Sequence, residues 1–236
     1  MSWDSWIGRT EVRSDRVDEA LCRRWLAALD RAAPSGSAMP QGIHFCLCTP
    51  EAPTAALGID GHPARDDSPD SFFPPIPLPR RMWAASDIAF LAPIPVGAQI
   101  DRISRIVSVS EKDGSTGKLG FVEVEHVTAA DEVEAVREKQ TLVYREASLP
   151  DAPLSPPPAG DGAFARDEWE QVESIVPPET LLLRHSALTF NPHRIPYDAP
   201  YARDVERYRG LVVHGPLIAT LLLQLAAAHY GDNQLN

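Results

Sequence analysis

The chain has 236 residues, of which 44% are hydrophobic, and a formal net charge of −11. This acidic excess argues against nucleic acid or an anionic membrane as the main partner, because phosphate binding depends on clustered Lys and Arg. No apolar run reaches the ~18 residues that a membrane-spanning helix needs, and the polar N-terminus is unlike a signal peptide, so we expect a soluble, cytoplasmic protein.

The first predicted element is a helix over residues 15–31. Apolar residues recur there at three- and four-residue intervals and form one helix face: Val17, Ala20, Leu21, Trp25, Ala28 and Leu29. Proline-rich sequence ends this helix, and residues 49–79 are so rich in Pro, Gly and Asp that an extended surface loop is predicted.

The three cysteines, Cys22, Cys46 and Cys48, are too few and too odd in number for a disulfide framework, so reduced thiols are expected. On a strand, His44, Cys46 and Cys48 would lie on one face as three potential metal ligands. A fourth ligand is not evident nearby, and the spacing is narrower than that of structural zinc sites. We therefore predict small buried residues and no metal site.

From residue 85 the pattern changes to that of β-strands. Alternating or continuous apolar runs predict four antiparallel strands, at residues 88–94, 99–110, 118–128 and 132–145. The glycine-containing segment 113–118 joins two of these strands and lacks the spacing of a phosphate-binding loop, so it is predicted to be a hairpin turn.

A proline-rich stretch, residues 149–163, is predicted to be an extended linker between two domains, 1–148 and 164–236. Beyond the linker, residues 169–176 can form a strand and residues 178–185 a short helical turn. Residues 215–228 are strongly apolar and carry Pro216 in the first turn of a predicted helix.

The residues most suggestive of chemistry lie between 184 and 217. An Asn-Pro-His cluster at 191–193 is followed by Asp198, and a His-Gly-Pro step at 214–216 leads into the apolar helix. An imidazole, an amide and a carboxylate near free helix N–H groups are suited to acid–base chemistry on a carbonyl compound.

Several segments, in order along the chain, carry a family resemblance: Trp6–Arg9, Arg81–Ala85, Ser186–Asn191 and Leu211–Pro216. In these segments the chain resembles the MaoC-like hotdog hydratases and dehydratases. Within that family it is most similar to the subgroup of type 2 hydroxyacyl-thioester dehydratases and mesaconyl-CoA hydratases.

The resemblance implies an α+β double hotdog, in which each antiparallel sheet wraps around a long helix. Residues 1–148 would form an N-terminal FAS1-like dehydratase domain and residues 164–236 a MaoC-like hotdog domain. In the resembled family, strands follow the helix that starts here at Gly215, but only six residues follow Tyr230. The second hotdog is therefore expected to be incomplete, with a second copy or a partner subunit covering the apolar helix.

The resemblance also implies a hydro-lyase that reversibly adds water to a 2-enoyl-CoA, with mesaconyl-CoA-like branched or dicarboxylic acyl groups as candidates. His193 is the implied general acid or base, Asn191 a positioning amide, Asp198 an orienting carboxylate, and the Gly215 N–H an oxyanion donor. Further residues expected to line the substrate site are Arg184, Thr189, Tyr197 and His214. No cofactor is expected, because the CoA thioester is the substrate.

Two departures from the family signature leave an alternative open. The broad signature has Asp where this chain has Thr189, and the subgroup has a second His where this chain has Pro196. Proline transfers no proton. A non-catalytic thioester-binding or scaffold subunit of a split enzyme is therefore the second hypothesis, and a thioesterase is a weaker third. The sequence also leaves open whether CoA or an acyl carrier protein bears the acyl group.

Overall fold

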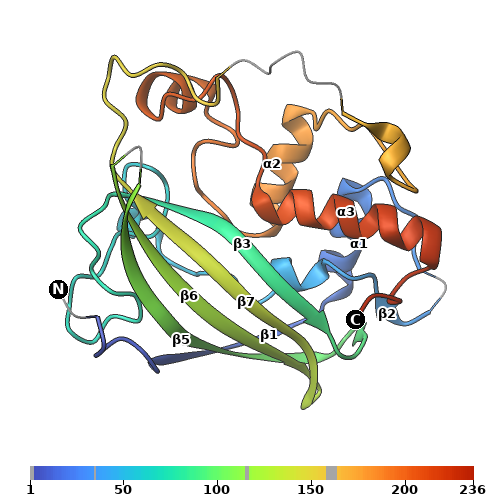
Figure 1. Cartoon of the computed structure of the whole chain (residues 1–236). Helices are drawn as coiled ribbons and strands as arrows, with labels where there is room; N and C mark the ends of the chain where they lie inside the picture. The colour runs from blue at the N-terminus through green and yellow to red at the C-terminus, as the bar shows by residue number, and fades with distance from the viewer. Residues whose placement is uncertain (1–2, 35, 115–116, 158–163) are drawn as a thin grey trace.

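A curved antiparallel sheet forms the body of the protein (Figure 1). The structure, a computed structural model, describes residues 3–34, 36–114, 117–157 and 164–236. Within them the main sheet has five strands in the order β1-β5-β6-β7-β3. Their bounds are Thr10–Arg16 for β1, Arg80–Phe90 for β3, Gln99–Gly114 for β5, Gly117–Ala130 for β6 and Val133–Arg145 for β7.

The four predicted strands are confirmed with changed boundaries: the strand predicted at 88–94 overlaps β3 only at residues 88–90, and β5 extends to Gly114. β5, β6 and β7 follow one another as antiparallel neighbours, and Gly114 pairs with Gly117 beside the predicted hairpin turn, of which residues 115–116 lie outside the described ones. β3 begins at Arg80 rather than at residue 88, and pairs with β7 from Arg145 to Val136. The register shifts between Trp83 and Ala85, and this irregularity disguises the strand pattern in the sequence.

The edge strand β1 was not predicted. Its sequence, TEVRSDR, is almost entirely polar, and its residues alternate between exposed and half-buried rather than between exposed and buried. A strand of this composition gives no hydrophobic period, and its position is fixed by pairing with β5, from Thr10 with Arg105 to Arg16 with Gln99.

The predicted first helix is confirmed as α1, Glu19–Ala28. Asp18 caps it by accepting a hydrogen bond from the Leu21 N–H at 2.8 Å. Its buried face, including Trp25 at 2% exposure, packs into a core with Ile43, Ile100 and Val136. A small sheet of β2, Ala38–Met39, and β4, Ile94–Pro95, borders this core.

His44 and Cys46 lie in a short 3₁₀ helix, Ile43–Cys46, and not on a strand. The three cysteines are free and buried, as expected. Residues 49–79 are mainly irregular, as predicted, with one 3₁₀ turn at Thr54–Ala56. Part of this segment packs on the sheet, where Ile76 and Leu78 join a second core with Val122.

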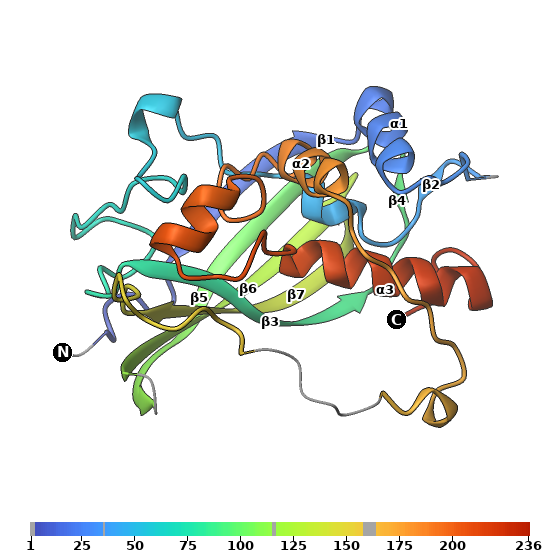
Figure 2. The ribbon, with the colours of Figure 1, turned by 90° about the horizontal axis from the view of Figure 1, so that it is seen from above.

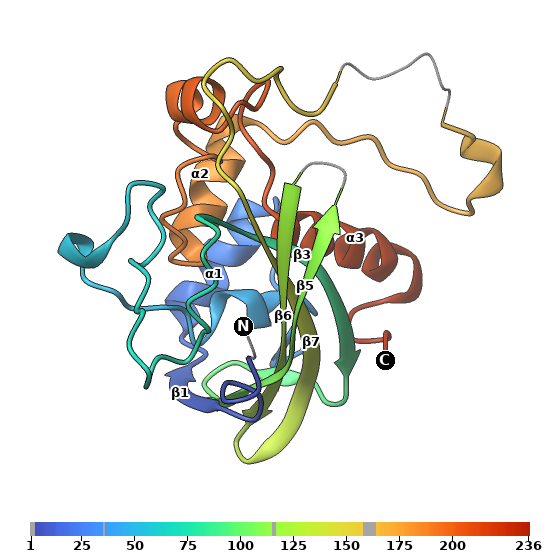
Figure 3. The same ribbon diagram turned by 60° about the vertical axis from the view of Figure 1, so that its left-hand side comes forward.

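The C-terminal part supplies helices to one side of the sheet (Figures 2 and 3). They are α2, Glu179–Leu188, a π-helical turn, Tyr201–Val205, and α3, Gly215–Tyr230. The predicted strand at 169–176 is wrong, because the described residues 164–236 contribute no strand to either sheet. Trp169 and Val176 are exposed, and Pro177 and Pro178 follow, so this segment has neither a pairing partner nor a buried face.

α3 lies beside β3, and its apolar surface is unevenly covered. Leu217 is fully buried, whereas Leu222 is 61% exposed and Ile218 49% exposed. Among the described residues no helix is both long enough and apolar enough to cross a membrane.

A buried ion pair attaches the C-terminal part to the sheet. Arg80, the first residue of β3, pairs with Glu206 and donates hydrogen bonds to the Tyr208 hydroxyl at 2.9 Å and the Ser148 hydroxyl at 2.7 Å. A second ion pair lies just beyond the C-terminal end of α3, where the Arg31 guanidinium binds the Asp232 carboxylate at 3.0 Å. These contacts join residues on either side of the predicted linker. Residues 158–163 of that linker lie outside the described ones, and the division into domains at 149–163 stays a prediction.

Candidate active site

The end of α2 presents the Asn-Pro-His segment. The Thr189 hydroxyl donates to the His185 carbonyl at 2.8 Å, and the Asn191 N–H donates to the Ser186 carbonyl at 2.8 Å, which closes the helix end. The Asn191 side-chain oxygen then accepts the His193 N–H at 3.0 Å. Thr189 and Asn191 thus fix the backbone that carries His193.

A loop from the N-terminal half, residues 58–62, docks onto this segment. Arg194 donates its backbone N–H to the Asp60 carbonyl at 2.9 Å and its side chain to the Ile59 carbonyl at 3.0 Å. Gly61 lies against the Pro192 carbonyl so closely that a Cβ on it would meet the oxygen at 2.0 Å. Segments 135 positions apart in the chain therefore meet at His193.

Two histidines and an aspartate come together at this junction. The ring of His62 lies 4.0 Å from that of His193, centroid to centroid, with 34° between their planes. Asp60 accepts a hydrogen bond from Nδ1 of His62 at 2.9 Å and from the His62 backbone N–H at 3.1 Å. The side chains of His62 and Asp60 are 20% and 24% exposed, so the pair is reachable from solvent.

Burial and charge set the protonation of this cluster. Burial, reinforced by the nearby His62, lowers the pKa of His193 to about 3, so its imidazole is neutral near pH 7. Burial also acts to raise the pKa of Asp60, but the hydrogen bond and charge of His62 outweigh it and the pKa is lowered. The aspartate is therefore a carboxylate that holds the Nδ1–H of His62.

These three residues also have the atoms that could hold a metal ion, since one ligand atom from each lies within 4.8 Å of the others. Zinc bonds to nitrogen at ~2.0–2.1 Å and needs the in-plane lone pairs of its ligands to converge. In this structure the rings of His62 and His193 are tilted by 34° to each other, and Nδ1 of His62 is engaged in its hydrogen bond with Asp60.

Asp198 and Tyr197 make contacts that stabilise the local chain. Asp198 accepts from the Arg194 guanidinium at 2.6 Å and from the Tyr201 N–H at 3.0 Å, at the start of the π-helical turn. These hydrogen bonds, that of Tyr201 foremost, lower the pKa of Asp198. The Tyr197 hydroxyl donates to the Pro192 carbonyl at 2.8 Å. The carboxylate oriented toward the histidines is that of Asp60.

A second group of candidate residues surrounds the start of α3. Nε2 of His214 is 2.7 Å from the Ser186 hydroxyl, and the rings of His214 and His185 are 4.6 Å apart. Burial lowers the pKa of His214 to about 4 and that of His185 to about 3, so both are neutral near pH 7. Gly215 lies against Trp83 of β3, where a Cβ would come within 1.6 Å of the indole ring.

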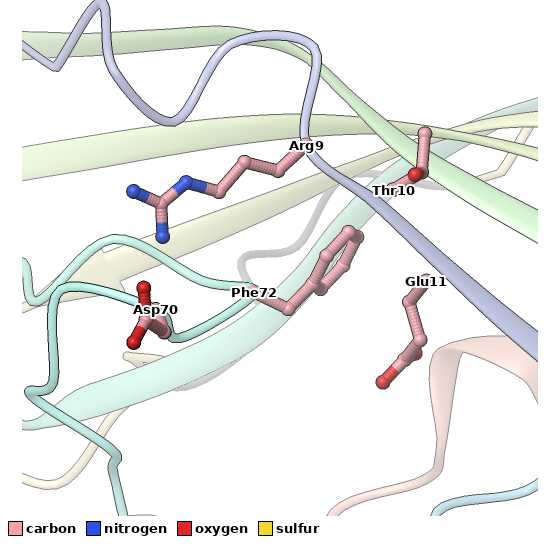
Figure 4. A pocket seen from close by; sticks show the side chains of 5 residues that line it. All are labelled: Arg9, Thr10, Glu11, Asp70 and Phe72. Atoms are coloured by element: carbon pink, nitrogen blue, oxygen red, sulfur yellow. The ribbon is translucent and has the colours of Figure 1, made fainter.

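The remaining candidate, Arg184, is exposed on α2. A hollow of about 500 Å³ lies elsewhere, lined by Arg9, Thr10, Glu11, Asp70 and Phe72 (Figure 4). Arg9 is already engaged there, since it donates to the Ser71 carbonyl at 2.6 Å. None of the residues expected at the substrate site lines this hollow.

Sequence reasoning missed Asp60 and His62, because they lie in a stretch whose composition indicates only a loop. Asp-Gly-His is a short motif in which the aspartate can reach the imidazole two residues on, and this signal was present. The local sequence could not predict that this motif contacts His193, because the two segments lie far apart in the chain.

Residues 42–236 match the family model described as hydroxyacyl-thioester dehydratase type 2. The chain is 42% identical over 235 residues to the mesaconyl-C(4)-CoA hydratase of Chloroflexus aurantiacus, in an alignment that covers 96% of this chain and 79% of that protein.

Solved structures agree on the fold. A MaoC-like dehydratase superposes with a TM-score of 0.65 at 13% identity, and a MaoC-like dehydratase from Phytophthora capsici with a TM-score of 0.61 at 11% identity. Each likeness covers 98% of this chain and 80% of the other. The chain thus has the α+β fold of the MaoC-like hotdog dehydratases, as expected, and it belongs to the hydroxyacyl-thioester dehydratase type 2 family.

Proposed function

We propose that the protein is a hydro-lyase that reversibly adds water to the double bond of a 2-enoyl-CoA, with a branched or dicarboxylic acyl group like that of mesaconyl-CoA. The observation that carries this proposal is the 42% identity to a mesaconyl-C(4)-CoA hydratase, which extends over 96% of the chain. Membership of the dehydratase family supports the reaction class.

The candidate site has the groups that this reaction needs. Hydration of an enoyl thioester requires a base for water, a proton for the α-carbon and stabilisation of an enolate oxygen. His193, whose backbone N–H is held by Asn191, is assigned to contact with the substrate at the junction of the two segments. The Gly215 N–H, at the N-terminus of α3, is assigned to the enolate oxygen, because a helix N-terminus favours negative charge.

Five further residues are assigned for the same reaction. Thr189 and His214 are assigned to the walls of the acyl site, Arg184 and Tyr197 to its solvent side, and Asp198 to holding the segment that carries His193. The chain needs no resident cofactor for this chemistry, since the thioester itself stabilises the enolate. We place the reaction in the cytoplasm, and we assign the exposed apolar residues Ile218 and Leu222 of α3 to contact with a second copy or a partner subunit.

The test is the loss of enoyl-thioester absorbance when purified protein is mixed with mesaconyl-CoA or crotonyl-CoA in water. We expect turnover of mesaconyl-CoA, and a loss of at least ~100-fold in His193→Ala. His229→Ala, on the exposed end of α3, is the matched histidine control and should retain activity.

A non-catalytic thioester-binding subunit is the second candidate, because Thr189 and Pro196 stand where the family signature has Asp and His. It predicts binding of crotonyl-CoA by calorimetry without any change in its absorbance.

Turnover that survives in His193→Ala would contradict the assignment of His193 to substrate contact. It would leave the hydro-lyase proposal itself standing.

A further inference from the structure

The structure shows a carboxylate–imidazole pair that the family signature does not contain. Thr189 and Pro196 replace an acidic and a basic position of that signature, so His193 is left there without the carboxylate that would orient it. Asp60 and His62 belong to the 58–62 loop, outside the signature segment, and they reach the site through the docking of this loop on Pro192 and Arg194.

We propose that Asp60 and His62 are the acid–base pair of this site, with His62 as the catalytic residue that exchanges protons with water and substrate. This inference rests on the proposed hydro-lyase function. It assigns to His193 the role of a neutral imidazole that packs on His62 and contacts substrate.

The hydrogen bonds favour His62 over His193 for this role. Asp60 holds Nδ1–H of His62 at 2.9 Å, which leaves Nε2 as the acceptor and stabilises the imidazolium once a proton arrives. Within the described part of the chain, the His193 ring has no hydrogen-bond partner, and its backbone alone is held, by Asn191. A carboxylate-oriented imidazole is the better positioned base of the two.

The loop fixes the pair in place. The Gly58 N–H donates to the His62 carbonyl at 2.7 Å, which closes a tight turn around Asp60. The Asp60 carbonyl accepts from Arg194, and Gly61 lies on the Pro192 carbonyl, so the turn is held on both sides. The 4.0 Å contact between His62 and His193 then sets the direction of the His62 ring. Such support is what a catalytic base requires.

The reaction balances with this pair alone. Nε2 of His62 takes a proton from water while the water oxygen bonds to the β-carbon, and the electron pair of the double bond moves onto the thioester as an enolate. The His62 imidazolium then returns the proton to the α-carbon, which forms the 3-hydroxyacyl thioester. One C–O and one C–H bond form, one O–H bond and the carbon–carbon π bond break, and nothing is oxidised or reduced.

The test compares His62→Ala and Asp60→Asn with His229→Ala and Asp66→Asn, two exposed controls of the same residue types. We expect a loss in kcat of ~10²–10⁴-fold for His62→Ala and at least about tenfold for Asp60→Asn. Free imidazole should restore part of the activity of His62→Ala, because it can supply the missing base, whereas it should leave Asp60→Asn unchanged. His62→Gln repeats the test if the alanine variant does not fold.

Three results would overturn the proposal. They are activity of His62→Ala within about threefold of the control, a loss that imidazole does not restore, or activity that a chelator abolishes and Zn²⁺ restores. The last would make the cluster a metal site.

A second measurement does not depend on turnover. Nitrogen NMR of labelled histidine should find His62 with its proton on Nδ1 in the parent protein and should find this preference lost in Asp60→Asn. A proton on Nε2 in the parent protein contradicts the pair even if the enzyme is active. If the parent protein does not hydrate an enoyl-CoA but this tautomer is found, the proposed function fails and the pair itself survives.

Discussion

Gly61 has its Cα against the carbonyl of Pro192, in a position where any Cβ would lie 2.0 Å from the oxygen. Its φ of 90° is also one that residues with a side chain rarely adopt. This contact joins the loop that carries Asp60 and His62 to the segment that carries His193. Glycine is therefore required at position 61 both by the backbone and by the close approach.

The first prediction separates these two requirements. Gly97 has nearly the same φ, 91°, but open space where a Cβ would be. Gly97→Ala should therefore show the backbone strain alone, whereas Gly61→Ala should destabilise the protein by at least about 1 kcal/mol more and reduce turnover of an enoyl-CoA. Urea unfolding of both variants measures the difference, and equal midpoints would contradict the tight contact.

The second prediction concerns Gly215 at the start of α3. Its φ is not in the left-handed region, so Gly215→Ala should act only through the clash with Trp83, where a Cβ would lie 1.6 Å from the ring. We expect a cost of about 1–3 kcal/mol in the free energy of unfolding. Gly210→Ala, with open space around the new Cβ, is the control and should change stability by less than ~0.5 kcal/mol.

A double-mutant cycle completes this test. Trp83→Leu removes the ring atoms that clash, so the cost of Gly215→Ala should be smaller in the Trp83→Leu background than in the parent. Additive costs would indicate that the effect of Gly215→Ala does not come from contact with Trp83.

The third prediction concerns the buried ion pair between Arg80 and Glu206, whose side chains are 9% and 7% exposed. Arg80→Met leaves a buried carboxylate without its charge partner and should cost ~3–5 kcal/mol. The double variant Arg80→Met with Glu206→Leu should recover much of this loss, because it removes both charges. Thermal unfolding of the parent and both variants measures the effect.

The exposed pair Glu19 and Arg23 on α1 is the matched control, with side chains 80% and 69% exposed. Arg23→Met should cost less than ~1 kcal/mol, since water screens the pair. A similar cost for Arg80→Met would contradict the structural role of the buried pair.

The fourth prediction is a fall in stability below neutral pH. Burial lowers the pKa values of His44, His185 and His193 to about 3, whereas an unfolded histidine has a pKa near 6.5. Between these values the unfolded chain binds protons that the native protein excludes. Stability is therefore full above pH ~6.5 and decreases as the pH falls through the window from ~6.5 to ~3.

His44→Phe tests one histidine of this set. His44 packs against Phe45 and Phe90, and neither of its ring nitrogens has a hydrogen-bond partner among the described residues. The variant should match or exceed the parent at pH 8 and should reduce the slope of stability against pH by about 1.4 kcal/mol per unit between pH 6 and 4. An unchanged slope, measured by urea unfolding at several pH values, would contradict a neutral buried His44.

The sheet and the long helices could be predicted because their patterns are local. Alternation in residues 99–145 and the apolar face of residues 15–31 identify β5, β6, β7 and α1. β1 could not be found in this way, because its polar residues leave no hydrophobic period and its pairing with β5 fixes it. Residues 169–176 had strand-like composition, but strands need a partner and none is present in the described structure.

The candidate site, like the fold, has local features that the sequence could predict and long-range contacts that it could not. The Asn-Pro-His and His-Gly-Pro motifs are contiguous and could be identified from the sequence. Their contacts are not contiguous: His193 meets His62, and Gly215 meets Trp83. The resemblance implies Asp198 as an orienting carboxylate, and in the structure its carboxylate accepts hydrogen bonds from Arg194 and the Tyr201 N–H.

The docking of the 58–62 loop on Pro192 and Arg194 also bears on how the protein unfolds. A ligand that touches both His62 and His193 binds only while the N-terminal and C-terminal parts are together, so it stabilises both at once. Saturating substrate or product should therefore raise the melting temperature of the whole chain in one transition. Hydrogen exchange should slow together in β3 and α2, although these elements lie far apart in the sequence.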